Sequence, residues 1–186
     1  TGIGTVLADD PRLNVRGLSR PRMHPRRVVV DPSWRSPVAS HLVRSTSGPH
    51  HESPVLVCGS RALQDTTEVS ERIRHLQRHG VTIGSASSAP GQSERLDLHA
   101  LVTFLHRDHA INTALLEAGP TLLGGFIELG LVDQAVVFVA RTPCDRAWPL
   151  QGPLAMSLDS LGPWRLARQR QVGPDAELVL IREDWC

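Results

Sequence analysis

Apolar residues in this chain fall into short runs and into stretches with helical spacing. Two stretches place their apolar side chains on one face of a helix, so they predict helices over residues 67–79 and 96–109. Short apolar runs bounded by turn residues are typical of buried strands. Such runs predict strands at residues 26–31, 54–58, 81–83, 111–116 and 135–139.

The segments between these elements follow less regular patterns. Residues 2–7 look like the tail of a strand and the turn after it, and a short helix is expected near residues 38–43. Small residues at 85–93 indicate a loop. Residues 122–129 predict a further helix, because glycine at position 130 is a common helix end.

Two closing strands are expected at residues 164–172 and 177–182, since Gly173-Pro174-Asp175 between them is a hairpin signal. Strands joined by a tight turn run antiparallel, whereas the alternation of strands and helices up to about residue 140 predicts parallel strands. We therefore expect one α/β domain over residues 1–186, with a mostly parallel sheet flanked by helices and an antiparallel C-terminal hairpin. No apolar run approaches the roughly 20 residues of a membrane span, so no membrane partner is expected.

Composition excludes several kinds of chemistry. All 20 basic residues are arginine, so the chain has no lysine for a Schiff base or a phosphate-binding P-loop. The net charge of +1 excludes a generally basic nucleic-acid binder. Cys58, Cys144 and Cys186 are too widely spaced for a disulfide framework, which indicates a reducing, cytoplasmic setting. No metal site is expected, because the three histidines of the predicted helix at 96–109 have no cysteine or carboxylate at ligand spacing.

The first segment that can carry chemistry spans residues 2–16, GIGTVLADDPRLNVR. Its glycines let a ligand approach the backbone, the Thr5 side chain offers a hydroxyl, and Asp9 and Asp10 can accept from ribose hydroxyls. Arg16 presents a planar fork suited to phosphate. Judged from the residues without any relative, a glycine turn followed by a solvated arginine is the simpler explanation.

The second segment spans residues 115–127, LLEAGPTLLGGFI, where a predicted strand runs through a glycine-rich turn into a helix. Free backbone amides at such a helix start bind phosphate, although the dinucleotide fingerprint G-x-G-x-x-G is absent. Glu117 is expected at the carboxyl end of its strand, where open α/β sheets bind ligands. The alternatives are a surface carboxylate at Glu117 and close helix packing at Gly124 and Gly125.

Taken together, the two segments resemble the reductase domain of the bacterial riboflavin-biosynthesis deaminase/reductase, a relative of dihydrofolate reductase in fold. The resemblance covers nearly the whole chain and is weakest between residues 40 and 95. It rests on ordered motifs, namely Gly4-Thr5-Val6, Asp10-Pro11, Leu13, Arg16, Glu117, Gly119 and Gly130-Leu131-Val132-Asp133.

This resemblance implies an NADPH-dependent reduction of the ribosyl side chain of 5-amino-6-(5-phosphoribosylamino)uracil to a ribityl chain. It implies substrate contacts from Leu13, Arg16 and Glu117. Ring opening of the substrate needs a proton, for which Glu117 and Asp9 are the candidate catalytic groups. The implied cofactor contacts are Thr5, Asp9, Ser33, Gly119, Pro120, Thr121, Leu122, Leu123, Gly124 and Gly125.

The chain also departs from the family pattern. The family's domain begins with a strand, a helix and the body of a second strand that are not found in residues 1–186, so we expect an N-terminally truncated reductase domain. The zinc deaminase domain of the family is also missing here and is expected upstream in the parent protein; a homodimer is a further candidate assembly. Pro32 follows the strand aspartate where the family has a small polar residue, which moves that expected contact to Ser33.

Two other functions remain open at this level. One is a catalytically silent, reductase-like fragment that serves as a binding or assembly module, which the missing N-terminal elements favour. The other is a reductase of the dihydrofolate-reductase-like group that acts on a pterin. The pairing of Leu13 with Arg16 favours a phosphosugar ligand over a pterin.

Overall fold

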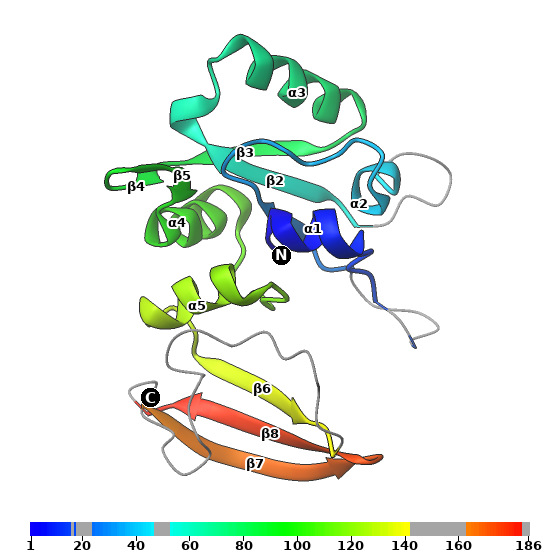
Figure 1. Cartoon of the computed structure of the whole chain (residues 1–186), viewed down its shortest axis with the longest axis vertical. Coiled ribbons are helices and arrows are strands. Elements are labelled where there is room, and N and C mark those ends of the chain that lie inside the picture. Colours follow the sequence, from blue (N-terminus) through cyan, green and yellow to red (C-terminus); the bar gives the residue numbers. More distant parts are fainter. Residues whose placement is uncertain (16, 18–23, 47–52, 142–162, 184–186) are drawn as a thin grey trace. The chain divides into compact units, whose positions relative to one another are not determined.

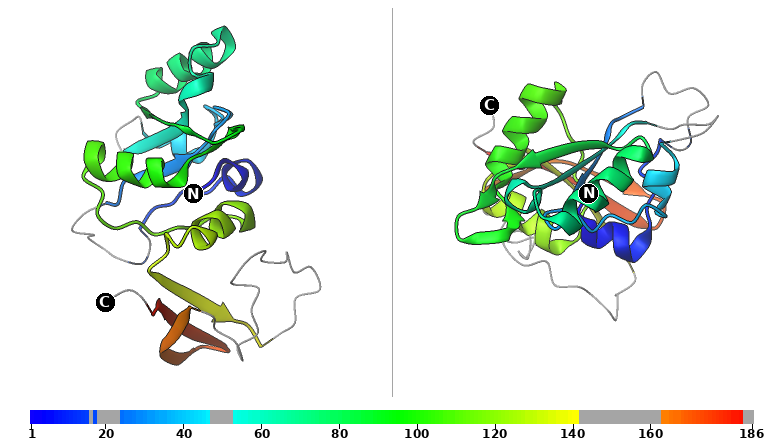
Figure 2. Two further views of the ribbon diagram at one scale, coloured as in Figure 1. Left: turned by 90° about the vertical axis from the view of Figure 1, so that its left-hand side faces the viewer. Right: turned by 90° about the horizontal axis from the view of Figure 1, so that it is seen from above.

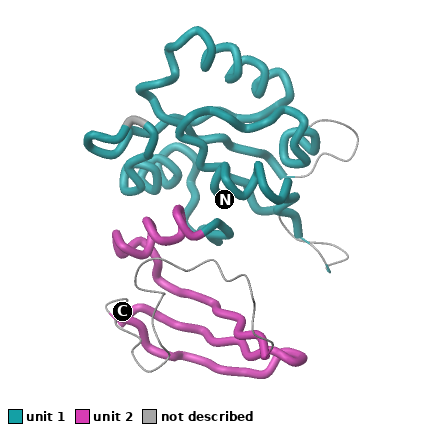
Figure 3. Tube along the Cα trace, viewed as in Figure 1, with its two compact units in different colours: residues 1–119 teal, residues 120–186 magenta. Residues whose placement is uncertain are grey.

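The protein is described from a computed structural model (Figure 1). The structure describes residues 1–15, 17, 24–46, 53–141 and 163–183. The chain divides into two compact units, Thr1–Gly119 and Pro120–Cys186, which are coloured separately in Figure 3.

The first unit is built on a three-stranded parallel sheet in the order β1-β2-β3. Its strands are β1 (Arg27–Val30), β2 (Val55–Ser60) and β3 (Thr82–Ala86). The central strand β2 is buried at every position, which explains why its sequence contains only apolar and small residues. On the outer side of β1, Gly2 forms a parallel bridge with Val30.

Helices pack on both faces of this sheet (Figures 1 and 2). α1 (Ile3–Asp9), α2 (His41–Arg44) and α3 (Thr67–Arg78) share one buried cluster with alternate residues of β1 and β2. α4 (Leu98–His109) packs on the opposite face, where its Phe104 ring lies so close to Gly84 that an added Cβ would come within 2.6 Å. The cluster consists of Ile3, Val6, Val29, Trp34, Leu42, Val43, Val55, Val57, Val69, Ile73, Leu76 and Val81.

Two short features complete the first unit. The 3-10 helix η1 (Arg61–Leu63) follows β2 directly. β4 (Ser88–Ala89) and β5 (Gln92–Leu96) pair antiparallel after β3, with Gly91 in the turn at a φ of +71°. The loop expected over residues 85–93 therefore contains the end of β3 and most of this pair.

The second unit holds α5 (Pro120–Glu128) and an antiparallel sheet in the order β6-β8-β7. Its strands are β6 (Gln134–Val139), β7 (Trp164–Val172) and β8 (Asp175–Arg182). Glu177 on the central strand accepts hydrogen bonds from Arg170, at 2.7 Å to each carboxylate oxygen, and from Arg168 at 3.1 Å. These arginines hold the pKa of the Glu177 carboxyl below its ordinary value.

The expected fold class is confirmed, because the structure contains parallel strands, flanking helices and the antiparallel β7–β8 hairpin with its two-residue turn. The strand predicted at residues 135–139 exists as β6, but it pairs antiparallel with β8 and does not join the parallel strands. Among the described helices, none is both long enough and apolar enough to cross a membrane.

The prediction of a strand tail and turn at residues 2–7 is wrong for residues 3–7, which belong to α1; only Gly2 pairs with a strand, through its bridge to Val30. Gly2 has an extended backbone (φ −95°, ψ 156°) and precedes the helix as its N-cap. Ile3 and Val6 are both buried in the core. Residues three apart share one face of a helix, whereas a strand would send them to opposite faces.

The prediction of a strand at residues 111–116 is also wrong. This segment runs without helix or strand, and Leu115 is 81% exposed. A strand needs a neighbouring backbone to satisfy its amides and carbonyls, and no strand of the described chain pairs with this segment. Glu117 therefore follows an irregular segment and not a strand.

Candidate active site

Helix α1 carries two of the predicted cofactor residues on one face. Thr5 and Asp9 are four residues apart, which places them on the same side of a helix. The Asp9 side chain is exposed, and no hydrogen bond or ion pair reaches it from the described residues. Asp9 is therefore free to accept from a ligand.

The neighbouring Asp10 is committed to the fold. It ends α1 in the left-handed conformation (φ 42°), and its amide donates to the Val6 carbonyl. One carboxylate oxygen accepts from the His41 amide at 2.7 Å, and the other lies 2.5 Å from the His41 Nδ1. The bond from the His41 amide is the main reason that the pKa of Asp10 lies below its ordinary value. Asp9 is thus the ligand candidate of this pair, and Asp10 has a structural role.

The two chemically interesting segments of the sequence meet at Thr5. The Gly119 backbone amide donates to the Thr5 Oγ1 at 3.2 Å. Glu117 is exposed, and its charge raises the pKa of the Thr1 amine, although burial lowers that pKa by more. Residues 117–119 therefore lie beside the beginning of the chain, and the structure brings Glu117 and Gly119 to the segment that carries Thr5.

The remaining predicted cofactor residues, 120–125, form the first turns of α5. The expected glycine-rich loop is thus helical, and Gly124 is buried within it. Pro120 occupies the first helical position, where its missing N–H costs nothing. Helix formation begins two residues earlier than the sequence pattern predicts.

Ser33 lies in the turn that follows β1, at the carboxyl end of the parallel sheet. Its side chain is partly exposed, and no hydrogen bond reaches it from the described residues. The carboxyl edge of parallel strands is the usual location of ligands in open α/β sheets. The position of Ser33 is therefore compatible with its expected cofactor contact.

The predicted substrate residues are only partly described. Leu13 has a left-handed backbone (φ 48°) and packs partly against the core cluster. The buried Arg27 donates to the Arg12 carbonyl at 3.2 Å and to the Ser45 hydroxyl at 2.7 Å, and so it braces the backbone next to Leu13. Arg16 lies outside the described residues.

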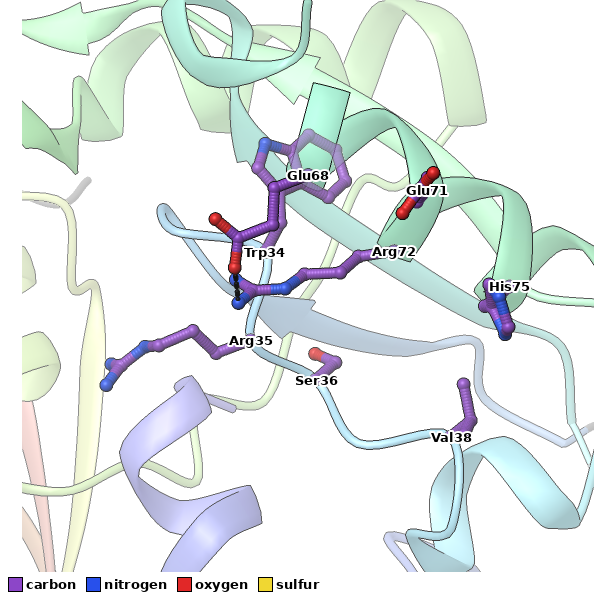
Figure 4. A pocket seen from close by; sticks show the side chains of 8 residues that line it. All are labelled: Trp34, Arg35, Ser36, Val38, Glu68, Glu71, Arg72 and His75. Atoms are coloured by element: carbon purple, nitrogen blue, oxygen red, sulfur yellow. Dashed lines mark hydrogen bonds and ion pairs between the residues drawn. The ribbon is translucent and has the colours of Figure 1, made fainter. Parts of the chain in front are cut away.

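An open cavity of about 510 Å³ lies beside the turn that holds Ser33 (Figure 4). It is bounded by the loop after β1 and by α3. None of its lining residues was predicted from the sequence as a site residue, although Arg35 is only two residues after Ser33. The lining residues are Trp34, Arg35, Ser36, Val38, Glu68, Glu71, Arg72 and His75.

Other chemistry is limited in the described part of the chain. It contains no group of three or more His, Cys, Asp or Glu residues placed to hold a metal ion. Burial raises the pKa of the Cys58 thiol to about 12, so this cysteine does not serve as a thiolate nucleophile near neutral pH. Cys144 and Cys186 lie outside the described residues. The His109 ring contacts Phe104 edge-on and Arg26 at 2.6 Å.

A parallel sheet flanked by helices, with hydroxyl, carboxylate and guanidinium groups near its carboxyl edge, is typical of α/β domains that bind ligands. The chain belongs to the RibD C-terminal domain family, whose model matches residues 1–142.

Curated relatives agree with this assignment. The chain is 34% identical over 145 residues to the 2,5-diamino-6-ribosylamino-4(3H)-pyrimidinone 5′-phosphate reductase of Archaeoglobus fulgidus, covering 74% of this chain and 58% of the relative. It is 28% identical over 194 residues to the riboflavin biosynthesis protein RibD of Escherichia coli, covering 97% of this chain and 47% of the relative. The chain thus spans about half the length of the curated relatives it matches.

Solved structures show the same fold. Acinetobacter baumannii RibD matches with a TM-score of 0.68 and 27% identity, covering 97% of this chain and 45% of that chain. Saccharomyces cerevisiae Rib7, a riboflavin biosynthesis reductase, matches with a TM-score of 0.70 over 98% of this chain and 73% of that chain. At 16% identity, this second likeness shows the fold.

Proposed function

We propose that this chain is the reductase part of a riboflavin-biosynthesis enzyme. It uses NADPH to reduce the ribosyl side chain of a 5-amino-6-ribosylaminopyrimidine 5′-phosphate to a ribityl chain. The observation that carries the proposal is the hydrogen bond from the Gly119 amide to Thr5, which joins the two predicted cofactor segments. The silent-module alternative is not favoured, because the chain keeps Thr5, Asp9 and Glu117 together with this contact.

The residues present fit a nicotinamide cofactor. Gly4 is exposed, and a Cβ at its position would meet no atom within 4 Å, so open space lies beside the first turn of α1. Asp9 can accept from a ribose hydroxyl, and the exposed Gly119 backbone lies beside the Thr5 hydroxyl within the same unit. The buried Oδ1 of Asp31 has no hydrogen-bond partner in the described chain and can accept from a ligand or a bound water. When bound, the cofactor supplies the hydride.

The protein's own part in the reaction is to orient the two reactants and to move a proton. Hydride transfer to C1′ of the substrate requires the ribose ring to open, and the ring oxygen then takes up a proton. Glu117 is the proposed proton donor, since its carboxyl is exposed and lies beside the Thr1–Thr5 segment. Leu13 is proposed to contact the substrate, and Arg16 is proposed to bind its phosphate.

Two pyrimidines are candidate substrates, and they differ in the group at C2 of the ring. The resemblance to the bacterial enzyme implies the uracil, which has an oxygen there. The relatives from Archaeoglobus fulgidus and Methanothermobacter thermautotrophicus, at 34% and 33% identity, are named for the diaminopyrimidinone, which has an amino group. These identities exceed the 28% identity to Escherichia coli RibD. For this reason the diaminopyrimidinone is kept as a candidate substrate beside the uracil.

A kinetic comparison tests the proposal. The full-length protein is mixed with NADPH and each pyrimidine in turn, and the product is analysed by mass spectrometry. We expect NADPH consumption with at least one of them and a product heavier by two hydrogens. The larger kcat/KM identifies the preferred ring. Absence of turnover with both pyrimidines would contradict the proposed reaction.

The proposed reaction also has consequences for the partners of this chain. A deaminase domain upstream in the parent protein would supply the uracil form of the substrate. A homodimer and a cytoplasmic location remain predictions, which size-exclusion chromatography with light scattering and cell fractionation would test.

A further inference from the structure

The loop after β1 is held at both ends by hydrogen bonds. Asp31 is fully buried, and its Oδ2 accepts from the Ser36 amide at 2.7 Å and from the Ser36 hydroxyl at 2.8 Å. The Asp31 amide donates to the Cys58 carbonyl at 2.8 Å, and the Ser60 amide donates to the Pro32 carbonyl at 3.1 Å. Both ends of the loop are therefore fixed, one to the end of β2 and one to the Asp31 carboxylate.

Trp34, in the middle of this loop, has a strained backbone. Its φ is +57°, a conformation that bulky residues rarely adopt. The indole is fully buried, and its Nε1 donates to the Ser60 carbonyl at 3.1 Å. The ring lies against Gly59, where an added Cβ would come within 2.2 Å of it. Such strain costs about 1–3 kcal/mol and is concentrated at ligand-binding and catalytic sites.

The residues on either side of Trp34 are left free by this arrangement. Ser33 is partly exposed and Arg35 is exposed, and neither has a hydrogen bond or ion pair with any described residue. Figure 4 shows the Arg35 side chain extended away from α3. The other arginine of the cavity, Arg72, is already paired with Glu68 at 2.5 Å. The loop therefore presents an uncompensated guanidinium and a hydroxyl two residues apart.

A guanidinium and a hydroxyl two residues apart in a loop at the carboxyl edge of a parallel sheet suit a phosphate group. The planar fork of arginine can bind two phosphate oxygens at once. In nucleotide-binding α/β folds, an arginine near the ribose is the usual partner of the 2′-phosphate, which NADPH has and NADH lacks. A phosphate at this place would balance the charge of Arg35.

We propose that Arg35, assisted by Ser33, binds the 2′-phosphate of NADPH and makes the protein prefer NADPH over NADH. This inference rests on the proposed function, because it assumes that a nicotinamide nucleotide binds at this edge of the sheet. Trp34 and Asp31 are positioning residues in this account. They fix the backbone of the loop that carries Ser33 and Arg35.

Titration calorimetry with NADPH and NADH on the full-length protein tests the proposal. Wild type is expected to bind NADPH more tightly than NADH. Arg35→Ala should raise the Kd for NADPH roughly 10- to 100-fold, the range expected for a lost charge-assisted bond, and leave the Kd for NADH unchanged. Arg72→Ala is the matched control in the same cavity, and we expect it to change neither Kd.

A competition experiment on unmodified protein makes the test independent of variants. We expect 2′-AMP to displace NADPH and 5′-AMP to displace it far less well. Equal weakening of NADPH and NADH in Arg35→Ala would overturn the 2′-phosphate assignment and place Arg35 at another phosphate. A wild-type preference for NADH would overturn it as well. Failure of wild type to bind either nucleotide would instead refute the proposed function, and this inference with it.

Discussion

The Gly119 amide donates a hydrogen bond to the Thr5 hydroxyl at 3.2 Å, although 114 positions separate the two residues in the chain. The contact brings the segment that begins with Glu117 to the first helix. This contact is the geometric basis for treating Thr5 and residues 117–119 as parts of one site.

The Thr5 side chain should matter for binding more than for stability. Thr5→Val keeps the shape of the side chain and removes the acceptor for Gly119, so we expect the Kd for NADPH to rise roughly 3- to 10-fold. Because the bond is exposed, the melting temperature should change little. Thr5→Ser keeps a hydroxyl and should bind nearly as wild type. Equal affinities in all three proteins would show that the contact has no part in cofactor binding.

The two adjacent aspartates should respond in opposite ways to the same substitution. The low pKa of Asp10 in the folded state means that the ionised carboxyl stabilises the fold at pH values above its ordinary pKa of 3.8. This contribution is lost as the pH falls through the lower folded value. Asp10→Asn should therefore lose about 0.5–1 kcal/mol at neutral pH, a small amount because the pair with His41 is partly exposed.

Asp9→Asn is the matched control for this experiment. It should leave the melting temperature unchanged and weaken NADPH binding, since Asp9 is exposed and unpaired in the described chain. Urea unfolding of both variants between pH 3 and pH 7 measures the difference. A loss of stability in Asp9→Asn as large as that in Asp10→Asn would contradict the roles assigned here.

The packing of Trp34 gives a sharp stability prediction at Gly59. In Gly59→Ala the new methyl group would lie 2.2 Å from the indole ring, so either β2 or the loop must move. Overpacking of this kind typically costs about 1–3 kcal/mol. Gly4→Ala is the comparison, because a Cβ there meets nothing within 4 Å. Gly4→Ala should be neutral or stabilise α1 by up to about 1 kcal/mol. Thermal melts of both variants measure the difference, and a Gly59→Ala protein as stable as Gly4→Ala would contradict the packing described here.

Glu117 should affect turnover and not cofactor affinity. Glu117→Gln removes the proposed proton donor and keeps the size of the side chain, so kcat should fall on the order of 10²- to 10⁴-fold. The Kd for NADPH should stay within about two-fold, because Glu117 is assigned to the substrate and not to the cofactor. Glu128→Gln, at another exposed carboxylate, should retain wild-type kcat. Wild-type turnover by Glu117→Gln would remove this residue from the mechanism.

Much of the fold could be predicted from local pattern, and the failures have a common physical cause. The strands β1 and β2 and the helices α3 and α4 follow from apolar spacing, because each buries a face that its own sequence defines. Residues 111–116 have the composition of a strand, but a strand also requires a backbone partner, which periodicity does not report. The strand tail predicted at residues 2–7 fails for a different reason. A helix over these residues can be recognised only when Ile3 and Val6 are known to lie in the same core.

Only the part of the candidate site that residue types and family motifs identify could be predicted from the sequence. Thr5, Asp9, Glu117 and Gly119 were selected from the sequence, and the structure brings Thr5 to Gly119. The choice between Asp9 and Asp10 depended on the contact of Asp10 with His41, which lies 31 positions away. Arg35 was missed because a single exposed arginine carries no signal in the sequence. Its significance comes from the left-handed Trp34 and the buried Asp31 beside it.

The most direct test of the account is to follow the hydride itself. The full-length protein is supplied with NADPH that carries deuterium at C4 of the nicotinamide, together with either pyrimidine, and the product is examined by NMR and mass spectrometry. We expect one deuterium at C1′ of a ribityl product. A product without deuterium at C1′, or a ribosyl side chain that remains unreduced while NADPH is consumed, would contradict it.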